Sequence, residues 1–112
     1  PGYITNTLLL LLLIAGFDLY RNGVADVASI DKTWMKSLGV DLGPLAMLDF
    51  VGMNTAYNVM QSYAELTGEE VWIKRRDFLK ENFINRNKLG ISTGEGFYKY
   101  PNPAYQDADF LK

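Results

Sequence analysis

The chain has 112 residues, 48% of them hydrophobic, and a formal net charge of -2 at pH 7 with a pI near 5.0. A chain of this size buries roughly two-thirds of its unfolded surface on folding, so we expect one independent compact domain spanning residues 1–112. The acidic balance excludes the basic stripe of nucleic-acid-binding proteins. The lack of cysteine and histidine excludes thiol nucleophiles and the usual soft metal ligands, and it fits a reducing, cytoplasmic location.

An apolar run at residues 8–15 follows the polar residues Thr5, Asn6 and Thr7. The run is shorter than the ~20 residues that cross a bilayer. No basic stretch or small-residue cleavage site marks it as a secretory signal. Because leucine favours helix over strand, we expect a helix of a soluble protein here. It should end near Asn22 and Gly23, and no membrane partner is expected.

Apolar residues occupy two faces of this expected helix. The smaller face consists of Leu10, Ile14 and Phe17. The larger face consists of Ile4, Leu8, Leu11, Leu12, Ala15 and Leu19. A helix that is apolar all round must be covered all round. Either the chain's other helices wrap around it, or a second subunit covers one face.

The next two expected helices are short and end at glycines. The first of them is capped by Asp26 or Ser29 and stops at Gly39. The second begins at Pro44, whose fixed φ suits a first helical position, and stops at Gly52.

Two longer helices follow. One is capped by Asn54 or Thr55 and stops at Gly68, and the other spans about residues 70–86 with Asn87 as a left-handed exit. Periodicity selects the residues of the last four helices that should face the core: Ile30, Trp34, Leu38, Leu45, Leu48, Val51, Ala56, Val59, Met60, Tyr63, Leu66, Val71, Leu79, Phe83 and Ile84. Only residues 97–100 suggest an extended segment. The predicted fold class is all-α with about five helices.

No segment fits a dinucleotide-binding domain. That fold needs a strand, a Gly-x-Gly-x-x-Gly turn and a following helix. The one glycine cluster, Gly90, Gly94 and Gly96, has too little chain after it to build them. Since the chain also begins with proline rather than methionine, we expect it to be a piece of a longer protein.

Three segments carry a family resemblance. They are Pro-Gly-Tyr-Ile-Thr-Asn at residues 1–6, Gly-Pro-Leu-Ala-Met-Leu-Asp-Phe-Val-Gly at 43–52, and Lys-Leu-Gly-Ile-Ser-Thr-Gly-Glu-Gly-Phe-Tyr-Lys-Tyr at 88–100. Their order and separation resemble the C-terminal domain of the NAD-dependent 3-hydroxyacyl-CoA dehydrogenases, and the resemblance covers nearly the whole chain.

The resemblance implies reversible hydride transfer between NAD and L-3-hydroxyacyl-CoA in a full-length enzyme. The dinucleotide-binding domain and the catalytic histidine would lie in the part absent from this chain. This domain would close the substrate cleft and supply a homodimer interface. The 112-residue chain alone is expected to be inactive and to hold no NAD.

The resemblance also implies site residues. Asn6 matches the family's cleft asparagine, whose amide reaches the substrate and the catalytic histidine, so we expect it to orient the substrate; the alternative is a helix cap. Thr7 departs from the arginine that usually follows. Gly43 and Pro44 are expected to shape a wall of the substrate cleft.

The glycine-rich turn is expected mainly to reverse the chain, so that the aromatic residues after it pack on the helices. The family commonly places a basic residue directly before Thr-Gly, and that residue can approach the dinucleotide. Ser92 stands there in this chain. The contact from Ser92 to the cofactor is therefore expected to be weak or absent.

Other candidate groups are expected to be structural. Asp49 should accept backbone N–H bonds at the start of the next helix, near Asn54. The basic residues Lys74, Arg75, Arg76 and Lys80 are expected to form a solvated helix face. The aromatic residues Trp34, Trp72 and Phe110 are expected to pack in the core or in an interface.

Two rival functions remain open on the sequence. One is a related dehydrogenase that acts on another hydroxy acid, such as a sugar acid. The other is a non-enzymatic helical module for dimerisation or binding, because a shared architecture does not fix function.

Overall fold

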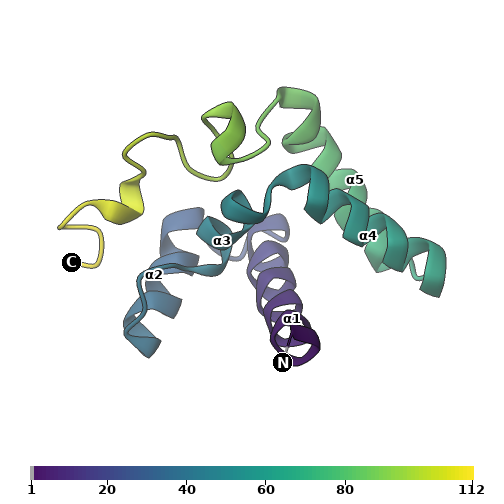
Figure 1. Ribbon diagram of the computed structural model, residues 1–112, viewed down its shortest axis with the longest axis horizontal. Coiled ribbons are helices and arrows are strands. Elements are labelled where there is room, and N and C mark those ends of the chain that lie inside the picture. The colour runs from purple at the N-terminus through teal and green to yellow at the C-terminus, as the bar shows by residue number, and fades with distance from the viewer. Residues whose placement is uncertain (1) are drawn as a thin grey trace.

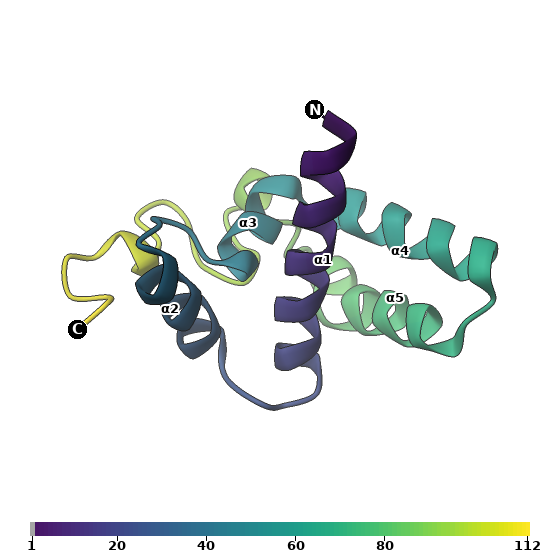
Figure 2. The same cartoon turned by 90° about the horizontal axis from the view of Figure 1, so that it is seen from below.

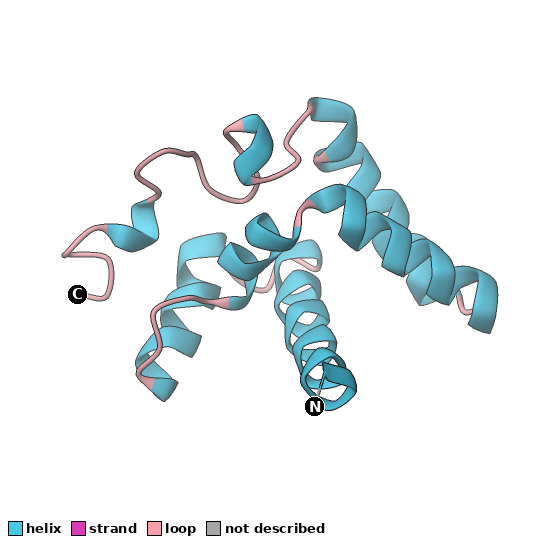
Figure 3. Ribbon diagram, in the orientation of Figure 1, coloured by secondary structure: helices cyan, strands magenta, loops and turns pink. Residues whose placement is uncertain are grey.

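A computed structural model describes residues 2–112; Pro1, which opens the first motif, lies outside the described residues. The described chain forms five α-helices: α1 (Gly2–Arg21), α2 (Val27–Leu38), α3 (Pro44–Val51), α4 (Met53–Thr67) and α5 (Glu70–Asn82). Three 3₁₀ turns follow, at Ile84–Arg86, Ile91–Thr93 and Ala104–Gln106 (Figure 3). Within residues 2–112, extended pairing is limited to isolated bridges of Glu95 with Gly90 and Lys99. The all-α prediction is confirmed.

The helices are arranged around α1. Helices α4 and α5 form an antiparallel pair on one side of it, α2 lies on the other side, and α3 crosses between them (Figures 1 and 2). The tail after α5 runs back over α3 and α2, so the C-terminal end of the chain lies beside α2 (Figure 1). In Figure 2 the first turns of α1 project beyond the neighbouring helices.

The expected helix ends are confirmed for α2 and α3. The Asp26 carboxylate accepts a hydrogen bond from the Ser29 N–H at 2.8 Å, and Gly39 closes α2 in the left-handed conformation. Pro44 is the first residue of α3. Gly39 and Pro44 thus fix the loop that leads into α3.

The expected caps of α4 are wrong. Helix α4 already begins at Met53, before Asn54 and Thr55, so neither residue caps it. Gly52, with φ of 90°, both ends α3 and precedes α4. Because glycine tolerates this positive φ, one residue suffices to turn the chain between two helices.

The expected end of α5 is also wrong. The α-helix stops at Asn82 rather than near residue 86, and Phe83 leaves it with φ of -126°. The buried Phe83 ring packs against Phe97 of the tail, with centroids 4.5 Å apart. The chain then enters a 3₁₀ turn, which ends at Asn87 in the expected left-handed conformation.

Two buried clusters form the core. The larger joins the five helices and comprises Leu13, Phe17, Ile30, Leu45, Leu48, Met53, Ala56, Met60, Leu79 and Phe83. The smaller joins the tail to α2 and α3 and comprises Met35, Ala46, Tyr98, Tyr105 and Phe110. The tail is therefore part of the folded domain, as the aromatic residues after the glycine-rich turn predicted.

Four residues expected in the core are exposed instead: Leu38, Val51, Leu66 and Val71. Leu66 is the extreme case at 80% exposure. It continues the apolar period of α4 into the last turn, but no other element covers its side chain there. Periodicity predicts which face of a helix is apolar, but it does not predict how much of that face the neighbouring helices cover.

Helix α1 buries Leu13, which belongs to neither expected face, and Phe17 of the smaller face, while Leu10 and Ile14 of that face are half-buried. Phe17 is fully buried, whereas Leu8 and Leu11 on the larger face are both 64% exposed. The chain's own helices therefore do not wrap around α1, which corrects the first of the two expected arrangements. We call the larger face, Ile4, Leu8, Leu11, Leu12, Ala15 and Leu19, the outer stripe of α1.

Helix α1 is long and apolar enough to cross a membrane by length and composition alone. Its middle is nevertheless built into the core through Leu13 and Phe17. Near its end, Asp18 accepts two hydrogen bonds from Arg75 of α5, at 2.7 and 3.0 Å. We therefore interpret α1 as a core helix of this domain.

Candidate functional site

Asn6 lies inside α1 and not at its start, because the helix begins at Gly2. The alternative that Asn6 caps the helix is therefore wrong. At helical spacing Asn6 shares a stripe with Leu10, Leu13 and Phe17, the residues that face α3 and the core. Its side chain is exposed because this end of α1 projects beyond the other helices (Figure 2). A free amide thus faces the α3–α4 side of the helix.

A small apolar cavity lies next to Asn6 along this stripe. Its volume is about 60 Å³, and it is lined by Leu10, Leu13, Ile14, Leu48, Val51, Ala56, Val59 and Met60. Leu10 is one helical turn from Asn6, which places their Cβ atoms about 6 Å apart. We call this cavity the α1–α4 notch; Asn6 is not among the residues that line it.

Gly43 and Pro44 are buried packing residues. A Cβ atom on Gly43 would lie 2.3 Å from Asp31 Cγ, and a Cβ atom on Gly16 of α1 would lie 2.8 Å from Pro44 Cγ. Asn6 precedes Gly16 by ten residues, about 15 Å along the helix axis. The structure therefore does not bring Gly43 and Pro44 to Asn6, and their contact with substrate stays a prediction.

Asp31 anchors the start of α3. Its carboxylate accepts hydrogen bonds from the N–H groups of Leu45 and Ala46, both at 2.9 Å, and from the Tyr98 hydroxyl at 2.8 Å. The sequence analysis missed this residue. Asp31 lies four residues before Met35 on an amphipathic helix, and the sequence alone predicts an exposed side chain there. Its role becomes visible only when the start of α3 is seen to pack against it.

Asp49 holds the tail and not the start of the next helix. Its carboxylate accepts from the N–H groups of Phe97 at 2.7 Å and Tyr98 at 3.0 Å, and from the Tyr100 hydroxyl at 2.8 Å. The expected structural role is thus confirmed, but the partners near Asn54 are wrong. Helix α4 needs no side-chain cap because it continues from α3 through one glycine.

Together these residues form a buried network that we call the aspartate–tyrosine clamp: Asp31, Asp49, Tyr98 and Tyr100. Loss of water raises the pKa of both aspartates, and the hydrogen bonds from three donors on each oppose that rise. Burial and the nearby carboxylates raise the pKa of both tyrosines, so their hydroxyls remain donors. Asp49 is 1% exposed, so the clamp is a structural element.

The glycine-rich turn fits against this clamp. A Cβ atom on Gly96 would lie 2.2 Å from Asp49 Oδ1, and one on Gly90 would lie 2.5 Å from the Asp49 carbonyl oxygen. Both positions require glycine for close approach. Ser92 is exposed in the 3₁₀ turn Ile91–Thr93 of the same segment, and its contact with a cofactor stays a prediction.

The basic cluster of α5 is only partly a solvated face. Lys74 and Lys80 are exposed, as expected. Arg75 is half-buried between Asp18 and the Trp72 ring, 4.4 Å from the ring centroid. Partial burial would raise the pKa of Asp18, but the hydrogen bonds and charges of Arg75 and Arg21 outweigh it and lower that pKa. Tertiary pairing thus removes Arg75 from the surface charge.

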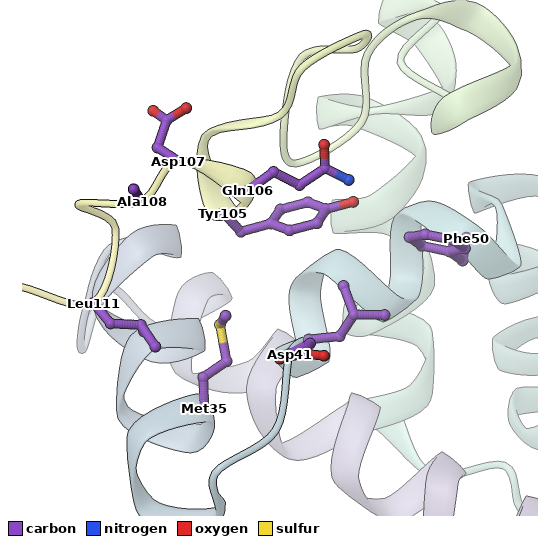
Figure 4. Close-up of a pocket in the computed structure, with 9 residues that line it drawn as sticks. Met35, Asp41, Phe50, Tyr105, Gln106, Asp107, Ala108 and Leu111 are labelled. Atoms are coloured by element: carbon purple, nitrogen blue, oxygen red, sulfur yellow. The ribbon is translucent and has the colours of Figure 1, made fainter.

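A hollow of about 240 Å³ adjoins the notch and is lined by Thr7, Leu10, Leu11, Ile14, Tyr63, Trp72 and Arg75. The two largest hollows lie away from Asn6. One, of about 510 Å³, is bordered by the α2–α3 loop and the tail, with Met35, Asp41, Phe50 and Tyr105 around it (Figure 4). The other is an apolar groove of about 450 Å³ between α1 and α2. Leu12, Ala15 and Leu19 of the outer stripe line this groove. Within residues 2–112, no group of three or more acidic residues is placed to hold a metal ion.

Known proteins resemble this chain over most of its length. A family model described as "3-hydroxyacyl-CoA dehydrogenase, C-terminal domain" matches residues 2–100. The mitochondrial hydroxyacyl-coenzyme A dehydrogenase of Rattus norvegicus is 35% identical over 100 residues, which are 89% of this chain and 32% of the rat protein. A probable 3-hydroxybutyryl-CoA dehydrogenase of Deinococcus radiodurans is 30% identical over 89% of this chain and 35% of that protein.

A solved structure shares the fold. It is described as "Substrate-directed dual catalysis of dicarbonyl compounds by diketoreductase", and it is 42% identical with a TM-score of 0.74 over 85% of this chain and 32% of that one. The fold and the matched segments are those of the helical domain of an oxidoreductase. The chain belongs to the 3-hydroxyacyl-CoA dehydrogenase C-terminal domain family. It spans about a third of the length of the relatives it matches.

Proposed function

We propose that the full-length protein is an NAD-dependent 3-hydroxyacyl-CoA dehydrogenase that interconverts L-3-hydroxyacyl-CoA and 3-oxoacyl-CoA. The family match over residues 2–100 supports this activity, and the observation that carries the role of this domain is the exposed Asn6 side chain, one helical turn before Leu10 of the α1–α4 notch. The chain contains no histidine. The proton-accepting base and the dinucleotide site are therefore assigned to another domain of the protein.

In this proposal Asn6 orients the reacting end of the substrate. An amide can donate an N–H to a hydroxyl or thioester oxygen while its carbonyl accepts from an imidazole, and neither contact changes its charge. The helix that carries Asn6 is anchored further along the same stripe, where Leu13 and Phe17 are buried in the core. Such preorganised donors stabilise charge that develops in the transition state.

Activity measurements test the assignment. The full-length protein is expected to reduce NAD in the presence of L-3-hydroxybutyryl-CoA, followed at the NADH absorbance. The 112-residue chain alone is expected to give no turnover and no tight NAD binding. Turnover by the isolated chain, or none by the full-length protein with any 3-hydroxyacyl-CoA, would contradict the proposal.

A second candidate substrate is a free carbonyl compound. It is favoured by the 42% identity to a structure whose description names a diketoreductase acting on dicarbonyl compounds. Reduction of a free diketone by NADH in the same assay, at a kcat/KM above that for the 3-oxoacyl thioester, would select this candidate.

We further propose that the outer stripe of α1 is a homodimer interface. Leu8, Leu11 and Ala15 lie on the opposite side of the helix from Asn6, because successive residues turn by about 100°. The stripe continues into the apolar groove between α1 and α2. Extended apolar surfaces of this kind are typical of subunit interfaces. A second copy covering the stripe would leave the Asn6 side open to substrate.

Leu11→Glu is expected to weaken dimerisation at least tenfold, because it places a charge in a desolvated interface. Light scattering coupled to gel filtration, over a range of concentrations of the chain, measures the change. Leu66→Glu is the matched control, since Leu66 is an exposed leucine of α4 and not of the stripe. A strictly monomeric wild-type chain at high concentration would overturn the interface.

The cytoplasm is the proposed location of the full-length protein. The bacterial relative supports it, whereas the rat relative is named as mitochondrial. Fractionation of the source cells with an antibody to this chain distinguishes the two compartments.

A further inference from the structure

We propose that a polar hollow at the start of the tail binds a small oxyanion, either inorganic phosphate or the terminal phosphate of a nucleotide. The hollow has a volume of about 140 Å³ and is bordered by the ends of α1 and α5, the first residue of α2 and the tail. We call it the tail hollow. Its polar lining consists of Tyr20, Asn82, Arg86, Lys88 and Glu95.

The tail hollow does not adjoin the proposed substrate contact. Tyr20 follows Asn6 by 14 residues on the same helix, which places them about 21 Å apart along the axis of α1. An anion in the tail hollow would therefore be held at the other end of α1 from the Asn6 side chain.

The charges around the tail hollow favour an anion. Arg86 and Lys88 contribute two positive charges, and Glu95 is the one acidic residue among the described residues that line it. The Nζ atom of Lys88 lies 3.4 Å from Oε2 of Glu95, so these two charges balance. Arg86 is exposed, and no ion pair within residues 2–112 involves its guanidinium. One positive charge at the hollow is thus left for a ligand.

The backbone holds the two basic residues on one turn. The N–H groups of Arg86 and Lys88 both donate to the carbonyl oxygen of Phe83, at 3.1 and 2.9 Å. Asn87 between them adopts the left-handed conformation. Because their backbone is already fixed, the two cations lose less conformational freedom on binding a ligand than cations on a mobile loop.

The hydrogen-bonding groups of these side chains suit phosphate oxygens. A guanidinium presents its N–H donors in a planar fork, an ammonium presents three donors, and neither group can accept a hydrogen bond. Charged donors of this kind bind phosphate oxygens more strongly than neutral donors do. An oxyanion is therefore the class of ligand that Arg86 and Lys88 select.

The size of the tail hollow fits one phosphate group. Its aromatic wall is fixed, because Phe97 packs edge-on against Tyr20, with centroids 5.3 Å apart, and against the buried Phe83 at 4.5 Å. The volume of about 140 Å³ equals the space of about five water molecules. A phosphate group is of that size, whereas a whole nucleotide is larger and could insert only its phosphate end.

The test is a titration of the 112-residue chain with sodium phosphate at constant ionic strength, followed by amide NMR spectra. The signals of residues 86–88 and 95–97 are expected to shift and saturate. Arg86→Gln and Lys88→Gln are each expected to weaken phosphate binding about tenfold, the effect of one lost charged hydrogen bond. Glu95→Gln is expected to strengthen it about threefold, because it removes the carboxylate that competes for Lys88.

Lys74→Gln is the matched control and is expected to leave phosphate binding unchanged. Lys74 is an exposed lysine of α5 that pairs with Glu70 and does not line the tail hollow. Circular dichroism reports whether each variant folds, and two basic residues in separate variants keep the test decisive if one of them does not. Shifts that never saturate, or equal phosphate affinities of the wild type, Arg86→Gln and Lys88→Gln, overturn the site.

Titrations with AMP and with adenosine distinguish the two sources of the phosphate group. Tighter binding of AMP than of inorganic phosphate, with no binding of adenosine, assigns the tail hollow to the phosphate end of a nucleotide. Equal or weaker binding of AMP assigns it to free phosphate. Binding of adenosine as tight as that of AMP overturns the site, because the phosphate group then contributes nothing.

Discussion

Replacing Asn6 with alanine in the full-length protein is expected to lower kcat for L-3-hydroxybutyryl-CoA about 100-fold. This is the magnitude seen when one preorganised donor to a transition state is removed. KM is expected to change less, because the coenzyme A part of the substrate keeps its contacts. Steady-state kinetics of NADH formation measures both constants.

The Asn6 variant should retain its fold, since the side chain is exposed and contributes nothing to the core. Asn85→Ala is the matched control, because it removes an exposed asparagine side chain from the 3₁₀ turn Ile84–Arg86. It is expected to leave kcat within twofold of the wild type. Full activity of Asn6→Ala would remove the central support for a cleft role.

Asp49→Ala is expected to lower the free energy of unfolding of the 112-residue chain by about 3 to 5 kcal/mol. The substitution leaves the N–H groups of Phe97 and Tyr98 without an acceptor and removes one partner of the Tyr100 hydroxyl, and loss of one side of a buried charged network has this cost. Domains of this size are stable by about 5–15 kcal/mol. Urea unfolding followed by tryptophan fluorescence measures the loss.

Hydrogen exchange separates the two halves of the aspartate–tyrosine clamp. In Asp49→Ala the amides of Phe97 and Tyr98 should exchange faster, whereas those of Leu45 and Ala46 should remain protected by Asp31. Asp41→Ala, at an exposed aspartate of the α2–α3 loop, is expected to change stability by no more than about 0.5 kcal/mol. An Asp49→Ala chain as stable as this control would show that the tail is held by apolar packing alone.

Local sequence signals located the helices because their causes are local. An aspartate that caps its own helix, a proline at a first helical position and a glycine in the left-handed conformation act within a few residues of themselves. Asp26, Pro44 and Gly68 confirm this for three of the five helices. The same signals failed at Phe83, where α5 ends and the ring packs on Phe97 of the tail.

The candidate site also has a part that the sequence predicted and a part that it did not. The motif that contains Asn6, and the family to which the chain belongs, were predictable from the sequence. The notch beside Asn6 was not, because its walls come from three helices and no pattern within one helix specifies how closely the others approach. Asp31 was missed for the same reason, since its partner Tyr98 is 67 residues away.

The sequence by itself determined that this protein is helical, where most helices begin and end, and that α1 has two apolar faces. Each of these properties follows from the periodicity and conformational preferences of neighbouring residues. Only the tertiary structure decided that Leu13 and Phe17 lie inside while Leu8 and Leu11 face outward. Apolar residues occupy both sides of this helix, so burial depends on which side the other helices cover, and that is decided by packing between segments far apart in the sequence.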